Sequence, residues 1–350
     1  MDKKPVLVDA RALNKKKAGV ARYIISIVRE LDKLGVDICL ISNNEIFLDD
    51  DLSHIKKREF KAFKYLPGTL FILFVLKFFY LRGKPIFWGA GQTTPIFGFY
   101  SILTVHDLVA FKYPETMTFV NRFFNRISIF LSIRFSSVLS SVSNITKKEM
   151  QEYFEIEKSI HVVPNSVDRN VFSMNKNKID SRFLLAVGTI EPRKNLIELL
   201  RAYELLVNFY DYDGYLYLIG DSGWKNDDLY AELERLQASD RVKFVGRVSD
   251  SELASYYSSC ELFVFPSLYE GFGIPPFEAL ASGARVVCTK NSELPFVYSG
   301  EGAVFYSPQE DDLIEKIIEG LAIDKPLGVD FSTWKDSALE LIRLMEGYEK

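Results

Sequence analysis

The chain has 350 residues, enough for two domains of about 100 to 200 residues with a core in each. Hydrophobic residues make up 48% and charged residues 26%, which excludes a disulfide-stapled miniprotein and a disordered chain. The net charge of -4 conceals an asymmetry. Residues 1–170 hold 25 Lys and Arg against 17 Asp and Glu, whereas residues 171–350 hold 18 against 30, so we expect two units with different partners.

Short apolar runs alternate with segments of helical period along the whole chain, a pattern typical of βαβ units and parallel sheets. In the first half, strands are expected at 6–8, 36–41, 86–88, 102–105, 138–142 and 161–163, and helices at 20–34, 119–135 and 145–154. In the second half, strands are expected at 183–187, 215–219, 242–245 and 262–265, and helices at 196–209, 251–258 and 334–348. The pattern predicts a first domain over 1–168, a polar linker over 169–181, a second domain over 182–333 and a C-terminal helix over 334–350.

Cysteine usage and hydropathy bear on the compartment. Cys39, Cys260 and Cys288 lie far apart in apolar stretches, which favours buried thiols in a reducing compartment over a disulfide framework or a zinc site. The N-terminal apolar run is too short for a signal peptide. The longest apolar stretch, 69–81, is shorter than the roughly 20 residues that a spanning helix needs. We therefore expect a cytoplasmic protein without a transmembrane anchor.

The segment 262–288, LFVFPSLYEGFGIPPFEALASGARVVC, predicts a βαβ unit with a functional loop. Gly271 and Gly273 in the loop let backbone N–H groups approach an anion, and the following helix N-terminus carries partial positive charge. Glu270 in the loop and Glu278, expected in the first helical turn, can each accept hydrogen bonds from vicinal hydroxyls. The segment predicts a ligand with phosphate beside polyol. The alternative is a solvated loop glutamate and an ordinary helix-terminal charge.

A second loop agrees with this prediction. Gly188 follows the strand expected at 183–187, and Arg193 and Lys194 lie shortly before the helix expected from 196. Arginine as a planar fork and lysine as a point charge can bind a diphosphate at the carboxyl end of a strand. The alternative is a solvated helix start, but adjacent cations near a helix N-terminus are mildly unfavourable without an anion.

The string EGFGIPPFE at 270–278 resembles the E-x7-E motif of family 4 retaining glycosyltransferases, and 188–195 resembles the G-x-x-x-P-R-K-N loop of that family. The resemblance also covers 218–220, 242–246 and 249–253. It implies an α/β protein of the GT-B fold, in which two Rossmann-like parallel-sheet domains face a central cleft, with the C-terminal helix packing back on the first domain. The motif sequences His-Asp-Leu and Pro-Arg-Lys-Asn are most similar to those of mannosyl- and rhamnosyltransferases of bacterial surface polysaccharide (O-antigen or capsule) synthesis.

The resemblance also assigns roles to residues. It implies that Arg193 and Lys194 contact the donor diphosphate, Glu278 the ribose and Glu270 the transferred sugar, with the turn at 246–248 near the base. Leu294-Pro295-Phe296 departs from the family, which often has Glu after Leu-Pro, so Phe296 receives no role. The implied donor-binding residues are Gly19, Arg193, Lys194, Gly246, Val248, Gly271, Phe272, Gly273, Ile274 and Glu278. The implied catalytic residues are Glu270, His106, Arg193 and Lys194, with Asp107 as a second-tier candidate.

Two elements of the first half belong to this comparison. Val-His-Asp-Leu at 105–108 closes an expected strand and resembles the family's H-D motif, whose histidine contacts the donor sugar. An isolated histidine is otherwise more often a packing residue, and Asp107 can simply cap the next turn. The segment 18–23 resembles the Gly-rich loop that closes over the donor phosphates, although Ala18 replaces one of the two glycines and leaves Gly19. The alternative for this segment is a routine turn.

Within the helix expected at 119–135, the segment 121–135 interleaves Arg122, Arg126 and Arg134 with aromatic and aliphatic residues. It is either a core-facing helix with solvated arginines or a surface for anionic lipid headgroups at the inner face of the cytoplasmic membrane. Lys15 to Lys17 and Lys56 to Arg58 add to the positive field. No nucleic-acid-binding module is recognisable, so nucleic acid is not expected as a partner.

These observations predict transfer of a hexose, mannose or rhamnose, from a nucleotide-diphosphate sugar to a hydroxyl of a lipid-linked or oligosaccharide acceptor, with retention. The sequence has no DxD pattern suited to a metal, so no metal or other cofactor is expected. One alternative is a nucleotide-sugar epimerase or phosphorylase on the same scaffold. Another is a sugar-nucleotide-binding protein without activity, although the joint presence of Glu270, Glu278, Arg193, Lys194 and His106 argues against lost function.

Overall fold

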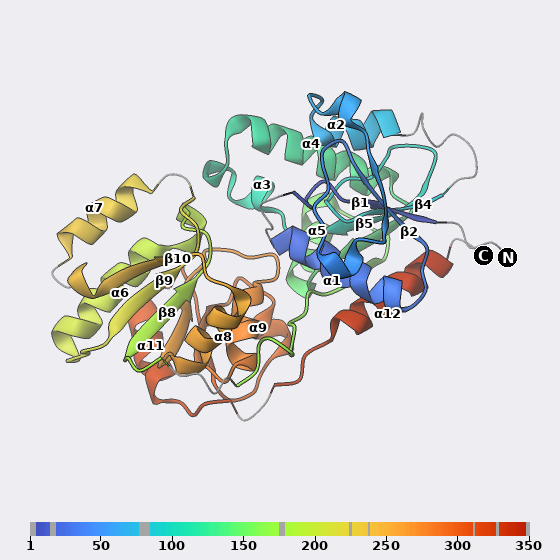
Figure 1. Ribbon diagram of the computed structural model, residues 1–350. Helices are drawn as coiled ribbons and strands as arrows, with labels where there is room; N and C mark the ends of the chain where they lie inside the picture. Colours follow the sequence, from blue (N-terminus) through green and yellow to red (C-terminus); the bar gives the residue numbers. More distant parts are fainter. Residues whose placement is uncertain are drawn as a thin grey trace. The chain divides into compact units, whose positions relative to one another are not determined.

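The computed structural model describes residues 5–14, 19–76, 85–174, 179–223, 226–236, 239–310, 312–326 and 329–347. The chain forms two compact units, each described by itself below (Figure 1). Unit 1 consists of Met1–Asn165 and Ser332–Lys350, and unit 2 of Ser166–Phe331. The described parts of 169–181 belong to unit 2, where Arg169 Nη2 lies 2.8 Å from Oδ1 of Asp330. Ala18 and Lys15 to Lys17, for which the sequence led to predictions, lie outside the described residues.

Unit 1 is built on a parallel sheet of seven strands in the order β3-β2-β1-β4-β5-β6-β7. Its strands are β1 (Val6–Asp9), β2 (Ile38–Ser42), β3 (Lys56–Glu59), β4 (Ile86–Gly89), β5 (Tyr100–Val105), β6 (Val138–Ser141) and β7 (Ile160–Val162). Its helices are α1 (Gly19–Lys33), α2 (Gly68–Leu70), α3 (Val109–Lys112), α4 (Phe119–Phe135), α5 (Asn144–Phe154) and α12 (Trp334–Glu346). The central strands are almost wholly buried, as expected for a parallel sheet covered on both faces.

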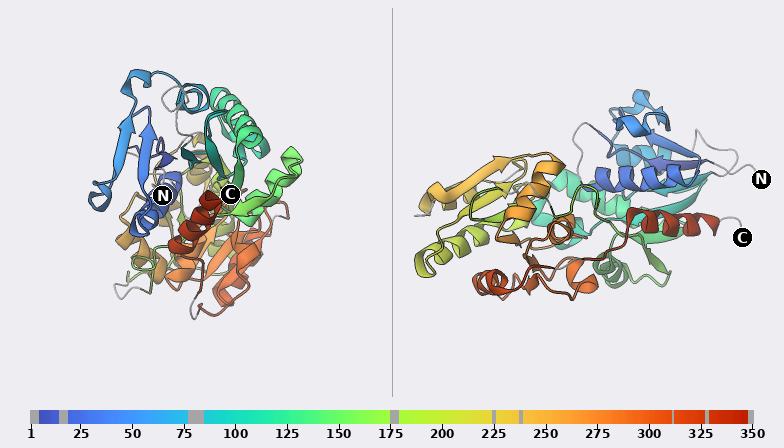
Figure 2. Two further views of the ribbon diagram at one scale, coloured as in Figure 1. Left: turned by 90° about the vertical axis from the view of Figure 1, so that its right-hand side faces the viewer. Right: turned by 60° about the horizontal axis from the view of Figure 1, so that its bottom comes forward.

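The C-terminal helix α12 lies beside α1, as Figures 1 and 2 both show. Its N-terminus has a capping box, in which the Thr333 hydroxyl accepts from the backbone N–H of Asp336 and the Asp336 carboxylate accepts from that of Thr333. Ala338 and Leu341 are fully buried, and the Trp334 ring lies 6.1 Å from that of Tyr23 on α1. The prediction that the last helix packs on the first domain is confirmed.

Strand β3 was not predicted. Its sequence, Lys-Lys-Arg-Glu, is polar throughout, and three of its four residues are exposed. It pairs with β2 alone, at the edge of the sheet, where lysines prevent pairing with further chains. An edge strand with no buried face has no apolar pattern, so the sequence did not reveal it.

Unit 2 is built on a parallel sheet of six strands in the order β10-β9-β8-β11-β12-β13. The strands are β8 (Phe183–Val187), β9 (Tyr215–Ile219), β10 (Val242–Gly246), β11 (Leu262–Phe265), β12 (Val286–Thr289) and β13 (Ala303–Tyr306). The helices are α6 (Leu196–Phe209), α7 (Asp227–Arg235), α8 (Asp250–Ser259), α9 (Ile274–Ala281), α10 (Leu294–Val297) and α11 (Leu313–Ala322). β8, β9, β11 and α6 have their predicted bounds, whereas β13, α7, α10 and α11 were not predicted.

Helices cover both faces of the unit 2 sheet. Alternate residues of β8 point to opposite faces, so that Leu184 joins the apolar cluster with α6 and α11. Phe183 instead lies against Tyr256 of α8, with ring centroids 6.1 Å apart. This three-layer arrangement with the order 3-2-1-4-5-6 is the Rossmann topology. The sequence-based prediction of two Rossmann-like parallel-sheet units is therefore confirmed.

The strand order determines where a ligand can bind. In unit 2 the chain proceeds from β8 outward to β10 and then crosses back to β11, so the order reverses between β8 and β11. Ligands of such sheets bind outside the carboxyl ends of the strands at this reversal. A close backbone approach there requires glycine, because a Cβ at Gly220 would lie 2.0 Å from the carbonyl oxygen of Gly188. The loops after β8 and β9 are therefore in close contact beside the reversal point.

Candidate active site

Two loops flank the strand-order reversal of unit 2. The loop after β8 runs from Gly188 to Asn195 and contains a short 3-10 turn at Pro192–Lys194. The loop after β11 runs from Pro266 to Gly273, and Leu268 N donates to the carbonyl oxygen of Arg193 at 2.9 Å. Backbone pairing thus holds the two loops together, although 76 residues separate Lys194 from Glu270.

An ion cluster joins the side chains of these loops. Oε1 of Glu270 lies 2.6 Å from Nζ of Lys194 and 2.7 Å from Nη1 of Arg193. Nη2 of Arg193 donates to Oε1 of Glu191 at 2.6 Å, and Nη1 donates to the carbonyl oxygen of Tyr269 at 2.8 Å. All four charged side chains are less than one fifth exposed. Two cations and two carboxylates therefore make a nearly neutral cluster in a site of reduced dielectric constant.

The surroundings shift the pKa values of two members of this cluster. Burial by itself would raise the pKa of Glu270, but Arg193 and Lys194 beside it lower that pKa to about 2. Burial lowers the pKa of Lys194, and Arg193 acts in the same direction, while Glu270 opposes both. Because two donors lie within 2.7 Å of one carboxylate oxygen, Glu270 is ionised at neutral pH.

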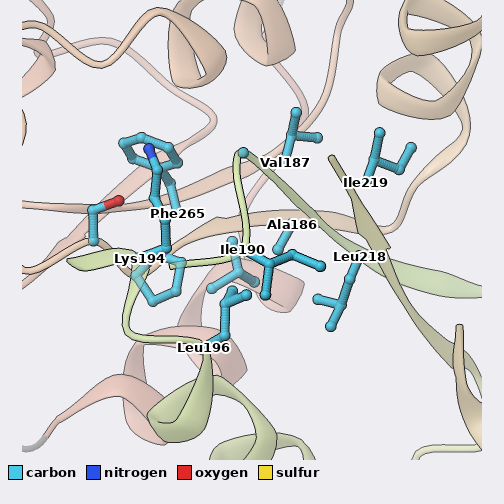
Figure 3. A pocket seen from close by; sticks show the side chains of 12 residues that line it. Ala186, Val187, Ile190, Lys194, Leu196, Leu218, Ile219 and Phe265 are labelled. Atoms are coloured by element: carbon cyan, nitrogen blue, oxygen red, sulfur yellow. The ribbon is translucent and has the colours of Figure 1, made fainter. Parts of the chain in front are cut away.

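A pocket opens at the carboxyl ends of β8, β9 and β11, beside the ion cluster (Figure 3). The Lys194 side chain lies along the ring of Phe265, with Nζ 4.9 Å from the ring centroid. The hydroxyl of Ser267, also in the wall, is buried and has no hydrogen-bond partner among the described residues. The residues that line the pocket are Ala186, Val187, Gly188, Ile190, Lys194, Leu196, Leu218, Ile219, Val264, Phe265, Pro266 and Ser267. An apolar pocket with one cation and one unpaired hydroxyl can bind a small polar group.

The rest of the predicted Gly-rich loop leads into α9. Gly271 and Phe272 are buried, and the Phe272 ring stacks on Phe277 with centroids 4.5 Å apart. Gly273 precedes the helix with φ of 83°, a backbone conformation that favours glycine. Ile274 is the first residue of α9 and is half-buried. The Phe272 side chain is therefore part of the core, while Gly273 provides the sharp entry into the helix.

Glu278 lies in α9, but not where the sequence suggested. The helix starts at Ile274, so its first turn contains no acidic residue and Glu278 follows in the second turn. The prediction placed it in the first turn because it took Pro275 as the helix start. The Glu278 carboxylate is buried, and Oε2 accepts from the Tyr257 hydroxyl at 3.2 Å.

The turn after β10 contains the two remaining candidates of unit 2. Gly246 ends the strand with φ of 80°, and its carbonyl oxygen accepts from Gly220 N at 3.0 Å. Val248 is half-buried two residues later. Both residues lie at the carboxyl edge of the sheet, on the β9 and β10 side of the reversal.

In unit 1, His106 directly follows β5 and is buried. Its Nε2 lies 2.7 Å from the carbonyl oxygen of Ala90, and its ring meets Tyr23 edge-on at 5.0 Å. Burial lowers the pKa of His106, although the Ala90 carbonyl and Asp107 oppose the shift. Because a carbonyl only accepts, Nε2 carries the proton and Nδ1 of the neutral ring does not.

Asp107 and Gly19 complete the predicted residues of unit 1. Oδ1 of Asp107 accepts from the backbone N–H of Val109 at 3.1 Å, so this carboxylate caps the turn that opens α3. Gly19 is the first residue of α1 and is exposed, and no atom lies within 4 Å of a Cβ placed on it. Asp107 therefore caps the next turn, which is the structural alternative to a catalytic role considered above.

Glu191 and the Asp9–Arg11 pair were not among the residues predicted from the sequence. Glu191 belongs to the loop already identified, but its charge gave no reason to group it with an anion-binding pair. Asp9 is fully buried at the end of β1, and Arg11 binds it through Nε at 2.8 Å and Nη2 at 2.7 Å. In both cases a carboxylate stands two residues before an arginine, at the end of β1 for Asp9 and in the loop after β8 for Glu191, and this spacing was the available signal.

Comparison with known families identifies the chain. The family described as Glycosyltransferase Family 4 matches residues 18–171, and the one described as Glycosyl transferases group 1 matches residues 168–328. The two matches meet close to the boundary between the units and together span most of the sequence. The chain belongs to the family 4 glycosyltransferases. The predicted GT-B fold class is confirmed, since the solved structures that this glycosyltransferase resembles share its two parallel-sheet units.

Curated relatives of this glycosyltransferase include two O-antigen enzymes. O-antigen chain mannosyltransferase B of Escherichia coli is 29% identical over 235 residues, covering 64% of this chain and 62% of the relative. O-antigen chain mannosyltransferase RfbU of Salmonella typhimurium is 28% identical over 222 residues, covering 63% and 60%. The matched region spans about three fifths of the length of these relatives.

Among solved structures, sucrose-phosphate synthase of Thermosynechococcus elongatus superposes with a TM-score of 0.76 at 19% identity, covering 99% of both chains. HepE of Anabaena, solved in complex with UDP-glucose, gives a TM-score of 0.70 at 16% identity, also covering 99% of both chains. At these identities the likeness concerns the fold.

Two further properties of the described residues concern metal ions and membranes. There, no group of three or more His, Cys, Asp or Glu side chains is arranged to hold a metal ion. Within the same ranges, none of the helices combines the length and the apolar composition that crossing a membrane requires. The three cysteines are free and buried, as predicted.

Proposed function

We propose that this chain transfers a hexose, mannose as the first candidate and rhamnose as the second, from a nucleoside-diphosphate donor to a glycan hydroxyl with retention. Mannose is preferred because the two O-antigen relatives are named mannosyltransferases. A nucleotide-sugar donor is supported by the complex of HepE with UDP-glucose on the same fold.

The observation that carries this proposal is the placement of Glu270 Oε1 between Lys194 Nζ and Arg193 Nη1. An anionic oxygen within hydrogen-bond distance of both cations occupies the position that a phosphate oxygen of a donor would take. The cluster lies at the strand-order reversal, where sheets of this kind bind nucleotides. The neighbouring hydroxyl of Ser267, which has no hydrogen-bond partner among the described residues, offers a further polar contact.

The proposed chemistry follows from this charge arrangement. The bond between the anomeric carbon and the diphosphate oxygen breaks, and a bond from the acceptor oxygen to the same carbon forms on the same face. The acceptor proton passes to the departing phosphate. Arg193 and Lys194 stabilise the charge that develops on the leaving group, which is the electrostatic form of catalysis. Once displaced from the cations, Glu270 can accept hydrogen bonds from sugar hydroxyls.

No metal or other cofactor is required in this proposal, because two side-chain cations meet the leaving group. Glu278 and the turn at Gly246 to Val248 are proposed to contact the ribose and the base. His106 is proposed to contact the donor sugar, offering the unprotonated Nδ1 to a sugar hydroxyl. These assignments extend the family resemblance to the residues at the carboxyl edges of the two sheets.

For the acceptor we propose a lipid-linked oligosaccharide and a peripheral membrane contact through α4. The outer side of α4 exposes large apolar side chains, among them Phe119, Phe123 and Phe130, each more than half exposed. Arg122 lies over the Phe119 ring at 5.3 Å, so apolar and cationic groups alternate on one surface, as anionic lipid headgroups require. Arg126 instead donates through Nε to the carbonyl oxygen of Ala110 at 2.7 Å, so we assign it a structural role and not a lipid contact.

The deciding experiment follows each donor with and without a glycan acceptor. GDP-, UDP- and dTDP-sugars are incubated with the chain, and released nucleoside diphosphate and product anomers are measured by NMR. We expect slow release of nucleoside diphosphate from the donor alone and faster release when a glycan is present. The glycan product should have the anomeric configuration of the donor. Isomerised sugar nucleotide without release would instead show an epimerase. Transfer of the sugar to added orthophosphate, giving a sugar phosphate, would show a phosphorylase, and tight binding without turnover would show a binding protein.

A further inference from the structure

Glu191 poses an electrostatic problem. Its carboxylate lies among the cations that we propose to bind a diphosphate, and like charges in a site of reduced dielectric constant repel. By charge alone, Glu191 therefore weakens the binding of an anionic donor. A side chain whose charge opposes the ligand must contribute through geometry if it contributes to function.

The geometry of Glu191 is specific. The residue precedes the turn at Pro192–Lys194 in extended conformation, and its carbonyl oxygen accepts from Lys194 N at 3.0 Å. Its side chain is 6% exposed, and Oε1 lies 2.6 Å from Nη2 of Arg193. Within the described ranges, Arg193 is the side chain that binds this carboxylate.

This contact orients the guanidinium. Guanidinium is a rigid planar fork, so holding Nη2 determines the direction of Nη1. With Nη2 on Glu191, Nη1 reaches the Tyr269 carbonyl oxygen at 2.8 Å and Glu270 Oε1 at 2.7 Å. That same Glu270 oxygen lies 2.6 Å from Lys194 Nζ. Arg193 and Lys194 thus converge on one oxygen because Glu191 holds the opposite side of the fork.

We propose that Glu191 is a positioning residue, which holds Arg193 so that Nη1 and Lys194 Nζ meet on one oxygen of the donor diphosphate. The inference rests on the proposed function. When a donor displaces Glu270 from the cations, Arg193 loses one carboxylate partner. Glu191 then keeps the guanidinium in place and avoids a rearrangement at the moment of reaction.

The test exploits the opposite signs of the charge effect and the positioning effect. Inorganic pyrophosphate is titrated calorimetrically into the wild type, E191Q and E191M. The glutamine side chain has a similar size and a neutral oxygen that can still accept the hydrogen bond from Arg193. The methionine side chain has a similar size but no such oxygen. Positioning predicts weaker binding in the order wild type, E191Q, E191M, with about a 10-fold to 100-fold loss in E191M, as for outer partners of a ligating group. Charge alone predicts tighter binding in both variants.

A double-variant cycle tests whether Glu191 acts through Arg193. In the R193A background, E191M should cause no further loss of pyrophosphate affinity, because the group that Glu191 orients is absent. Glu232 offers a matched control, since its carboxylate binds Arg201 and Arg235 between α6 and α7, away from the carboxyl edge. E232Q should leave the pyrophosphate affinity of the chain unchanged.

The outcomes separate the inference from the proposed function. Unchanged or tighter pyrophosphate binding in folded E191Q and E191M would overturn the positioning role and leave the diphosphate site intact. Absence of pyrophosphate and nucleoside-diphosphate binding in the wild type would overturn the proposed site, and the inference with it. If E191M fails to fold by circular dichroism, the comparison of E191Q with the wild type decides, because its expected sign is the same.

Discussion

Lys194 Nζ and Glu270 Oε1 lie 2.6 Å apart, although 76 residues separate them in the sequence. The contact joins the loop after β8 to the loop after β11, and Arg193 Nη1 binds the same oxygen at 2.7 Å. The two cations that we propose to bind the donor diphosphate are therefore paired with a carboxylate of the chain in this structure. Replacing any one of these three side chains must therefore change the ion-pair contacts of the other two.

Replacement of Glu270 should abolish most of the transfer activity while the chain stays folded. E270Q removes the ionised acceptor proposed for the sugar hydroxyls, so kcat/KM for transfer should fall by about 100-fold or more. A matched control is E261Q, at the start of β11 and thus at the opposite edge of the sheet, where Glu261 binds Arg182. Steady-state kinetics of both variants decide, and full transfer by E270Q would contradict the site assignment.

The depressed pKa of Glu270 makes the stability of the chain pH-dependent. In the folded chain this pKa is about 2, against an ordinary value of 4.5. The unfolded chain therefore binds more protons between these pH values, so the stabilisation is complete above pH 4.5 and is lost as pH falls toward about 2. The difference in free energy of unfolding between wild type and E270Q should shrink over this window. Urea unfolding of both proteins at several pH values measures it, and a constant difference would refute it.

Gly220 should tolerate no side chain. A Cβ at this position would lie 2.0 Å from the carbonyl oxygen of Gly188, and the φ of 150° is itself unfavourable for other residues. G220A should therefore lower the free energy of unfolding by about 2 kcal/mol or more. G19A is the comparison, because nothing lies within 4 Å of its Cβ and alanine favours a helix. Equal stability of the two variants in urea unfolding would argue against the close approach.

Transfer should not depend on a divalent cation. In the proposed reaction Arg193 and Lys194 offer two positive charges to the leaving diphosphate, which is the role that a metal plays in metal-dependent transferases. Initial rates should stay the same after dialysis against a chelator and after addition of magnesium or manganese. Loss of activity with the chelator, restored by one of these ions, would show that the leaving group needs a metal.

The outer side of α4 should bind anionic vesicles. The double variant F119S/F123S removes two exposed apolar side chains, so its affinity for vesicles containing phosphatidylglycerol should fall at least about 10-fold. Phe209 is 73% exposed at the end of α6 in the acidic half, which makes F209S the matched control with unchanged binding. Co-sedimentation at low and high salt measures both. Equal vesicle binding by wild type and F119S/F123S would exclude α4 as the contact.

Some elements were predicted from the sequence more accurately than others, and the differences have physical reasons. Phe183–Val187 and Leu262–Phe265 were predicted to the residue, because a buried parallel strand is a continuous apolar run bounded by Gly or Pro. β3 was missed because the residues of an exposed edge strand bury no face. The start of α9 was shifted by one residue, because Gly273, through its positive φ, precedes the helix and lets it begin at Ile274 instead of Pro275.

The sequence by itself determined the two loops, their cations and carboxylates, and the alternation that makes parallel sheets. Only the tertiary structure decided which charges meet. Strand order brings Lys194 to Glu270, and side-chain geometry assigns Glu191 to Arg193, and neither is encoded in local periodicity. Burial, which shifts the pKa values of Glu270, Lys194 and His106, likewise depends on contacts between distant segments. Local pattern thus supplies the chemical groups of the site, and long-range packing sets their distances and charges.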